Sequence, residues 1–284
     1  MRQFVIFSIL LLPIQIVHAD TGTIFYPRYQ DDTRFIDIVE LLNGALEKTT
    51  KEFGGYQLMA SPQQMTENRQ QQALEAEQGI HLMWMSTSPD KETRFKAIQI
   101  PLRKGLLGYR ISLIHNEEQS KIDRLSSMKD LLKIQIGQGI GWGDVSIYRY
   151  SRIKVFQAPY KALFRMLNSK RFDIFPRGIN EVFDEYSQQK EDNPNITIES
   201  NLLLYYPWPY YIFTSKKNPL LHQRIETGFN QMIKDGSFDR IFMKHHADAI
   251  QKARFDQRRV IQIPNPYLPS NTPLDRTELW FQVK

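Results

Sequence analysis

The sequence contains no cysteine among its 284 residues. This absence excludes a disulfide scaffold, thiolate zinc sites and a cysteine nucleophile. The excess of positive over negative charge is also small, since the chain has 37 Lys and Arg and 31 Asp and Glu. The net charge of +6 is spread over the whole chain, without a dense basic run or a basic helix face. We therefore expect no nucleic-acid partner.

Patterns of catalytic and metal-binding residues are missing as well. The six histidines show no metal-ligand spacing, and no serine sits in a nucleophile-elbow motif. The glycine-spaced segment 137–143 does not fit the dinucleotide-binding pattern, because its third glycine would fall on Trp142. We expect a protein that is not an enzyme and that holds neither a metal nor a cofactor.

The amino terminus has the pattern of a signal peptide. An apolar run from Phe4 to Val17 is followed by small residues that end at Ala19. The alternative is a membrane anchor, but Pro13 and Gln15 interrupt a run shorter than the roughly 20 residues a span requires. We expect cleavage after Ala19 and a mature chain outside the cytoplasm. No cysteine follows the run, so we expect no lipid anchor.

Apolar and aromatic residues are present in amounts typical of a folded protein. Hydrophobic residues make up 41% and aromatic residues 12% of a chain whose length suits two compact lobes. Short apolar runs alternate with segments of helical period, the pattern of an α/β fold. The predicted strands are 24–26, 56–59, 80–85, 109–114, 133–136, 154–157, 172–175, 196–204 and 211–214. The predicted helices are 35–49, 66–77, 127–132, 159–167, 179–189, 220–235 and 238–245, followed by an extended tail from Pro264.

Four segments carry a resemblance to a known family. They are residues 88–95, 128–139, 167–173 and 234–241. In order and spacing they resemble the periplasmic solute-binding proteins of family 3, the type represented by polar amino acid receptors, over roughly residues 22–250.

The resemblance implies a periplasmic binding protein-like fold of type II, with two α/β lobes joined by two crossing strands. Lobe 1 would hold residues 20–107 and 210–284, including the tail. Lobe 2 would hold residues 108–209, and residues 1–19 would be the signal peptide. Such lobes close on a small ligand like a clamp.

The resemblance also implies a ligand site in lobe 1. In the family, the loop after the third strand supplies hydroxyls and amides, here Ser86, Thr87 and Ser88, and a following arginine clamps the ligand's carboxylate. Arg94 matches that arginine by position. A guanidinium suits a planar carboxylate, because two parallel charge-assisted hydrogen bonds set orientation as well as affinity. The alternatives are that the hydroxyls cap their own turn and that Arg94 is an exposed helix-end charge.

Lobe 2 departs from the family pattern. Amino acid-binding members place an acidic residue shortly after the strand equivalent to 172–175, but this chain has Arg177 and Gly178 there. Arg177 suggests a second anionic group on the ligand, as in a dicarboxylate, a phosphorylated or sulfonated compound, or an acidic peptide fragment. The alternative, which is compatible with ligand contact, is an ion pair with Glu181.

Aromatic and glycine residues complete the predicted site. Tyr26, Trp84 and Trp142 fall near strand ends, where clefts of such sheets open. Gly139 belongs to the glycine-spaced segment, whose backbone N–H groups could face an anion. The alternative for the aromatic residues is a place in the core.

These observations favour a monomeric, periplasmic solute-binding protein for a small anionic ligand. Its partner would be an ABC permease or the periplasmic domain of a membrane sensor. One alternative is an enzyme on the same scaffold, similar to periplasmic cyclohexadienyl dehydratase. Another is an interaction protein without a ligand in the cleft.

Overall fold

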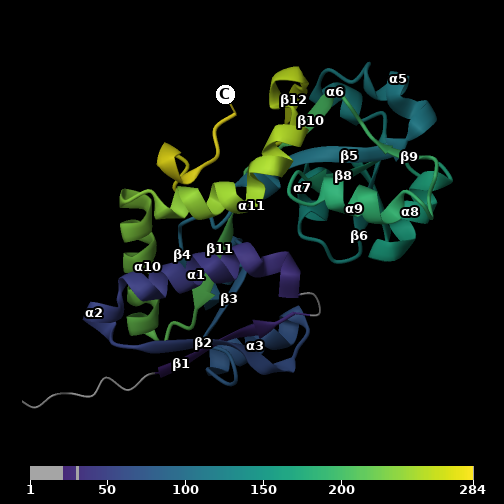
Figure 1. Cartoon of the computed structure of the whole chain (residues 1–284). Helices are drawn as coiled ribbons and strands as arrows, with labels where there is room; N and C mark the ends of the chain where they lie inside the picture. The colour runs from purple at the N-terminus through teal and green to yellow at the C-terminus, as the bar shows by residue number, and fades with distance from the viewer. Residues whose placement is uncertain (1–21, 30–31, 284) are drawn as a thin grey trace, which may run out of the picture.

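The computed structural model describes residues 22–29 and 32–283 of the chain. The predicted signal peptide lies outside these residues. Figure 1 shows two lobes, with a long helix, α11 (Ser237–Ala253), running from one lobe to the other. No helix in the described part of the chain combines the length and the apolar character needed to cross a membrane.

Lobe 1 contains a two-stranded sheet and a three-stranded sheet, covered by helices on both faces. Its strands are β1 (Gly22–Arg28), β2 (Tyr56–Gln64), β3 (Leu82–Ser86), β4 (Lys96–Ile98) and β11 (Tyr210–Thr214). Its helices are α1 (Ile36–Lys48), α2 (Thr50–Phe53), α3 (Glu67–Ala76), α4 (Pro89–Arg94) and α10 (Pro219–Lys234), with the short 3-10 helix η1 (Asp32–Phe35) before α1. β1 and β2 pair in parallel, and β11 pairs antiparallel with β3 and β4. The His81 N–H, just before β3, donates to the Phe25 carbonyl of β1 at 2.9 Å, where these two sets of strands meet.

The core of lobe 1 has two layers that follow from strand alternation. Leu82 and Trp84 of β3 face α1 and α10, whereas Met83 and Met85 face α3. In α1 the buried residues recur three and four apart, as the sequence predicts for a helix with one apolar face.

Lobe 2 is a mixed seven-stranded sheet. Its strands are β5 (Tyr109–His115), β6 (Gln135–Gly139), β7 (Lys154–Ala158), β8 (Ile174–Gly178), β9 (Ile196–Ile198), β10 (Leu202–Tyr205) and β12 (Arg259–Gln262). Its helices are α5 (Gln119–Ile122), α6 (Met128–Leu131), α7 (Asp144–Tyr150), α8 (Tyr160–Asn168) and α9 (Val182–Gln189), with the 3-10 helices η3 (Asn116–Glu118) and η4 (Phe255–Gln257). α8, α9 and part of α11 cover one face of the sheet, and α5, α6 and α7 cover the other.

Two links connect the lobes and lie side by side. The first runs from β4 through η2 (Leu106–Gly108) into β5, and the second joins β10 to β11. The Tyr206 N–H donates to the Gly108 carbonyl at 3.2 Å, and the Leu102 N–H donates to the Tyr210 carbonyl at 3.0 Å. A Cβ atom on Gly108 would lie 2.2 Å from the Tyr206 carbonyl oxygen, so only glycine permits this close approach.

The carboxyl-terminal part departs from the predicted boundary. We expected residues 210–284 to belong to lobe 1, but β12 pairs in parallel with β10 in the lobe 2 sheet. Phe242 and Ala253 of α11 are likewise buried in the lobe 2 core. The physical reason is that α11 is long enough to carry the chain from α1 to the open edge of β10. The tail, which holds η5 (Thr277–Leu279), then returns to the link between the lobes, where the Phe281 N–H donates to the Lys104 carbonyl at 2.7 Å.

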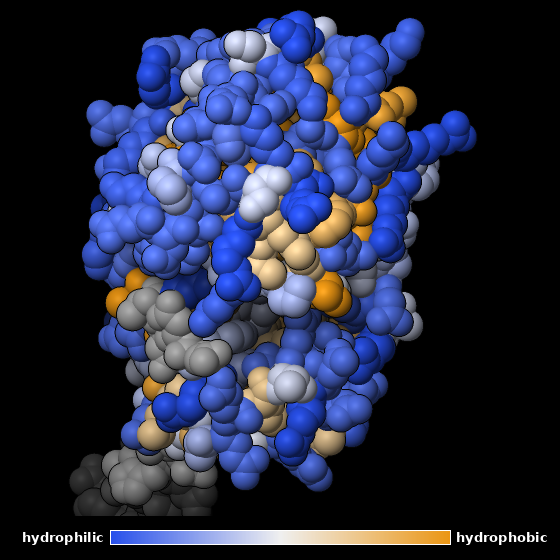
Figure 2. Space-filling view, turned by 90° about the vertical axis from the view of Figure 1, so that its right-hand side faces the viewer, coloured by the Kyte–Doolittle hydropathy of each residue, from blue (hydrophilic) through white to orange (hydrophobic). Residues whose placement is uncertain are grey.

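The surface is mainly polar, in keeping with a mean hydropathy of −0.46. Figure 2 shows one face, on which hydrophilic residues dominate and hydrophobic residues gather mostly in the upper half. Ile36 and Ile140 are among the exposed apolar residues. They are the sequence neighbours of Phe35 and Gly141, which line the cavity described below.

Two glycines in the contact between α1 and α10 provide a matched test of this packing. A Cβ on Gly228 would lie 2.1 Å from the Ala45 carbonyl oxygen, whereas a Cβ on Gly44 would meet the flexible end of Met232 at 2.9 Å. We expect Gly228→Ala to lower the free energy of unfolding by about 2 kcal/mol or more, because backbone atoms cannot move aside. Gly44→Ala should change it by less than about 1 kcal/mol, because the higher helix propensity of alanine offsets a small movement of Met232. Urea unfolding of the two variants measures the difference, and equal losses would contradict this description of the packing.

Candidate functional site

A cavity of about 450 Å³ lies between the two lobes. Lobe 1 contributes Phe35 and Tyr210, and lobe 2 contributes Trp142 and Trp208. Its charged lining residues come from helices, loops and strand ends of both lobes: the cations Arg34, Lys91, Arg103, Arg110 and Arg177, and the carboxylates Glu67, Asp144 and Glu181. Five cations against three carboxylates give the cavity a positive lining. This is the concave, mixed polar and aromatic surface typical of a small-molecule site.

Glu181 occupies the centre of the charged cluster. Its Oε1 accepts from Arg34 of lobe 1 at 2.6 Å, and its Oε2 lies 3.1 Å from a terminal nitrogen of Arg177. The Gly178 N–H also donates to Oε2, at 3.2 Å. Burial alone would raise the pKa of Glu181, but Arg177, Arg34 and Arg110 outweigh it and lower the pKa to about 2. Glu181 is therefore an ionised group of lobe 2 that holds lobe 1 through Arg34.

Arg177 lines the cavity but is already engaged by carboxylates. Its Nε and one terminal nitrogen donate to the two carboxylate oxygens of Glu185 at 2.6 and 2.7 Å. The ion pair with Glu181 that the sequence raised as an alternative is present, and the pair with Glu185 is an addition. The guanidinium also lies 4.6 Å from the ring centre of Trp142. These contacts orient Arg177 and use most of its donors.

Arg103 is engaged in a second buried cluster. It donates to both carboxylate oxygens of Asp37 at 2.6 and 2.8 Å and to the Arg34 carbonyl at 2.8 Å. On the other side of Asp37, Nε2 of His246 lies 3.0 Å from Oδ2. Burial alone would raise the pKa of Asp37, but Arg103 and His246 together hold it well below its usual range. This cluster joins α1, the first link between the lobes, and α11.

Arg110 differs from the other buried arginines of the cavity because its donors are poorly satisfied. It is 4% exposed, and its Nε has no hydrogen-bond partner among the described residues. Its terminal nitrogens lie 3.4 Å from Asp144 and 3.8 Å from Glu181, longer than the roughly 2.7–3.2 Å typical of N–H···O bonds. Its guanidinium lies 5.4 Å from the ring centre of Tyr206. A buried guanidinium with unused donors at the wall of a cavity is suited to an anionic ligand.

The predicted loop in lobe 1 contributes one of its three hydroxyl residues to the cavity. Ser86 lines it, and Lys91 Nζ donates to the Ser86 carbonyl at 2.9 Å. Thr87 Oγ1 instead donates to Glu92 at 2.6 Å. Ser88 Oγ accepts from the Lys91 N–H at 3.3 Å and caps α4, the role that the sequence raised as an alternative.

Arg94 is not brought to the cavity. Its terminal nitrogens donate to Gln71 at 2.9 Å and to Glu75 at 3.0 Å, both on α3, and its guanidinium lies over the Phe95 ring. The physical reason is that α4 begins at Pro89, directly after its cap, and Arg94 in its last turn faces α3. Lys91, one turn earlier in α4, is the cation of this helix that lines the cavity.

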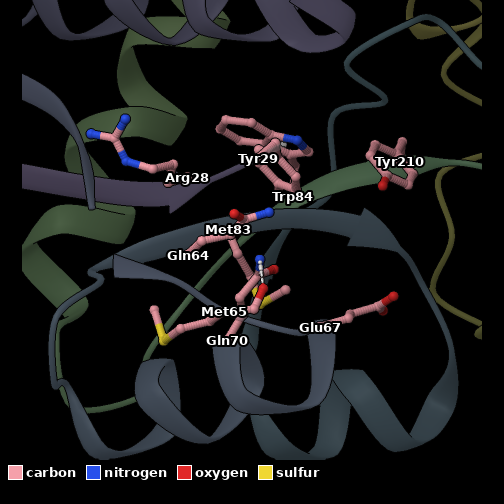
Figure 3. Close-up of a pocket in the computed structure, with 9 residues that line it drawn as sticks. All are labelled: Arg28, Tyr29, Gln64, Met65, Glu67, Gln70, Met83, Trp84 and Tyr210. Carbon is pink, nitrogen blue, oxygen red and sulfur yellow. Dashed lines mark hydrogen bonds between the residues drawn. The ribbon is translucent and has the colours of Figure 1, made fainter. Parts of the chain in front are cut away.

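The predicted aromatic and glycine residues do not all lie at one site. Trp142 lines the cavity and packs on Gly139, where a Cβ would lie 2.2 Å from the indole ring. Trp84 lines a second, smaller pocket of about 220 Å³ in lobe 1, shown in Figure 3. Tyr26 packs against Trp84 with ring centres 5.5 Å apart and lines neither of these two cavities.

Sequence reasoning missed Arg34, Arg103 and Arg110, as well as the part that Glu181 plays between the lobes. One signal was available for Arg110. It is the second residue of β5, the strand that directly follows the glycine-bounded segment 105–108, where a side chain lies close to both lobes.

No protein-family model and no curated protein sequence matches the chain. Solved structures do. An ancestral arginine-binding protein bound to arginine is 17% identical, with a TM-score of 0.54 over 80% of this chain and 99% of that one. An amino acid ABC transporter substrate-binding protein from Streptococcus pneumoniae bound to L-arginine is 14% identical, with a TM-score of 0.54 over 82% of this chain and 96% of that one.

A third similar structure is an ancestral amino acid-binding protein, a precursor of cyclohexadienyl dehydratase. It is 17% identical, with a TM-score of 0.56 over 79% of this chain and 95% of that one. At such identities the likeness concerns the fold. The predicted fold class is confirmed: the chain has the two-lobed α/β fold of the amino acid-binding proteins of ABC transporters.

Proposed function

We propose that this protein captures a small anionic solute between its two lobes. The observation that carries the proposal is Arg110, a buried guanidinium with unused donors at the wall of a positively lined cavity. An anion there would make charge-assisted hydrogen bonds that the protein itself leaves unmade. The proposed ligand class rests on this chain's own residues, because two of the similar structures are bound to arginine and support only the general role of solute binding.

Closure of the lobes is the proposed mechanism. Arg34 and Glu181 already join the two sides of the cavity, and a ligand that contacts both sides adds further contacts available only in the closed form. Differential contacts of this kind shift the population toward closure. We propose that the closed form, outside the cytoplasm, is recognised by an ABC-type permease or a membrane sensor.

A zwitterionic amino acid fits the lining less well than an anion does. Glu181 and Asp144 are the carboxylates on the lobe 2 side of the cavity. Glu181 is already paired with Arg34 and Arg177, and Asp144 accepts from the Tyr206 hydroxyl at 3.0 Å. An ammonium group would have to compete with these partners beside an excess of cations.

Thermal unfolding against a ligand panel tests the proposal. The panel holds amino acids, dicarboxylates, organophosphates, sulfonates and short peptides. A ligand at one hundred times its dissociation constant should add about 2.7 kcal/mol to the free energy of unfolding. That corresponds to a rise of a few degrees in Tm for a chain of this size.

We expect stabilisation by anions that lack an ammonium group. Stabilisation confined to zwitterionic amino acids would contradict the ligand class, and no stabilisation by any compound would contradict the solute-binding role. Product formation from a prephenate-like substrate in the same samples would indicate an enzyme instead.

A further inference from the structure

We infer that the ligand is elongated, with its anionic head at Arg110 in the cleft and a flat tail that carries a hydrogen-bond acceptor in the side pocket beside Trp84. This inference rests on the proposed function and adds the shape and chemistry of the solute. Its basis is a second cavity that adjoins the first and contains an unused buried donor.

The side pocket continues from the cleft cavity. Glu67 and Tyr210 line both, so the two spaces share one wall. In Figure 3, Tyr210 and Glu67 lie at one end of the pocket and Arg28 at the other, with Trp84 and Tyr29 between them. A ligand that enters from the cleft therefore passes the two aromatic residues before it reaches Arg28.

Trp84 provides the donor. Its side chain is 1% exposed, and its indole Nε1 has no hydrogen-bond partner within the described part of the chain. Its ring is fixed by stacking on Tyr29, with centres 5.2 Å apart, and by contact with Phe35 at 5.6 Å. Buried indole N–H groups usually find an acceptor, so the lining of this pocket favours a ligand that supplies one.

The rest of the lining selects for a flat body with a polar end. Met83 and Met65 provide apolar surface, and the pocket volume of about 220 Å³ suits a single ring. At the far end, Arg28 donates through Nε to the Ser61 carbonyl at 2.9 Å, which fixes the base of its guanidinium. The terminal nitrogens of this exposed arginine form no hydrogen bond or ion pair with the described residues. A carbonyl or carboxylate at the end of the tail therefore suits both Trp84 and Arg28.

Three probes separate head from tail: succinate, 3-phenylpropanoate and 3-(4-carboxyphenyl)propanoate. Succinate offers two carboxylates without a ring, 3-phenylpropanoate offers one carboxylate with a ring, and 3-(4-carboxyphenyl)propanoate offers a carboxylate head with a ring and a terminal carboxylate. Titration calorimetry on the protein should give the third probe at least about tenfold higher affinity than succinate, because it buries a ring and meets the unused donors.

Two variants locate the effect. Trp84→Phe keeps a ring but removes the N–H, and Arg28→Gln removes the cation at the far end. Each should weaken binding of 3-(4-carboxyphenyl)propanoate about threefold to tenfold while leaving succinate unchanged. Arg165→Gln, at an exposed position of α8, is the matched control and should change neither.

Each alternative outcome has a definite meaning. Equal affinity for the three probes overturns the elongated ligand but leaves the proposed function intact. The same holds if the two variants lower the affinity for all three probes equally. No binding of any probe overturns this inference, and the wider ligand panel then decides separately on the proposed function. Because Trp84 also packs in the core, the Tm of each variant is first compared with that of the wild type. If Trp84→Phe does not fold, Arg28→Gln alone still decides the test.

Discussion

Replacing Arg110 with glutamine should weaken binding of the anionic ligand by at least about 100-fold. Arg110 is buried at the cavity wall, its Nε has no partner among the described residues, and Asp144 and Glu181 lie 3.4 and 3.8 Å away. Its donors are therefore available to a ligand, and removing one partner of a buried, hydrogen-bonded charge pair costs about 2–5 kcal/mol. A 100-fold weaker affinity corresponds to about 2.7 kcal/mol, which is within that range.

The same substitution at two other arginines separates ligand binding from structural roles. Arg94→Gln should leave binding unchanged, because Arg94 donates to Gln71 and Glu75 away from the cavity. Arg177→Gln should lower stability, because Glu185 and Glu181 would lose their buried partner. Titration calorimetry with a ligand from the panel measures binding, and Tm measures stability.

The opposite pattern would be equally informative. If Arg94→Gln abolished binding and Arg110→Gln did not, the arginine implied by the family resemblance would be the clamp after all. In that case α4 would have to move when the ligand binds, since Arg94 is held on α3 in this structure.

Elements such as α1 and β3 could be predicted from local pattern because each carries its own period. The buried positions of α1 recur as the sequence indicates, and β3 alternates between two cores. The place of β12 could not be predicted this way. Whether an extended segment near residue 260 pairs with β10 depends on where α11 delivers it, and this is a property of the assembled lobes.

The site could be predicted only in part for a similar reason. Sequence spacing brought Trp142, Arg177 and Ser86 to the cavity, since these residues lie at strand ends or in the loops that follow them. Ion pairs with carboxylates decide which arginine remains available to a ligand. These pairs form between side chains that are far apart in the chain. Arg177 meets Glu185 in the next helix, and Arg103 meets Asp37 from 66 residues away, whereas Arg110 finds no such partner for its Nε among the described residues.

Asp37→Asn should be the most destabilising single change in the cluster that joins the lobes. Asp37, Arg103 and His246 are 4%, 5% and 6% exposed, and the carboxylate accepts from Arg103 at 2.6 and 2.8 Å. Removing its charge leaves the Arg103 guanidinium buried without a counter-ion. Breaking a buried pair from one side costs about 3–5 kcal/mol.

Glu40 provides a matched control on the same two helices. It lies one turn after Asp37 in α1 and pairs with Lys244 and His245 of α11, but its side chain is 34% exposed. Solvent screens such a pair, so Glu40→Gln should lower the free energy of unfolding by less than about 1 kcal/mol. Urea unfolding at pH 7 compares the two variants, and similar losses of stability would contradict the role assigned to the buried cluster.

The acid dependence of stability gives an independent readout of the same group. Arg103 and His246 hold the pKa of Asp37 below the 3.8 of an ordinary aspartate, despite the opposing effect of burial. A carboxylate with a lowered pKa in the folded state stabilises the protein above its unfolded pKa, and this contribution is lost as the pH falls below about 3.8. The wild type should therefore lose more stability than Asp37→Asn between about pH 5 and pH 2. Parallel acid profiles would show that the Asp37 carboxylate does not supply this stabilisation.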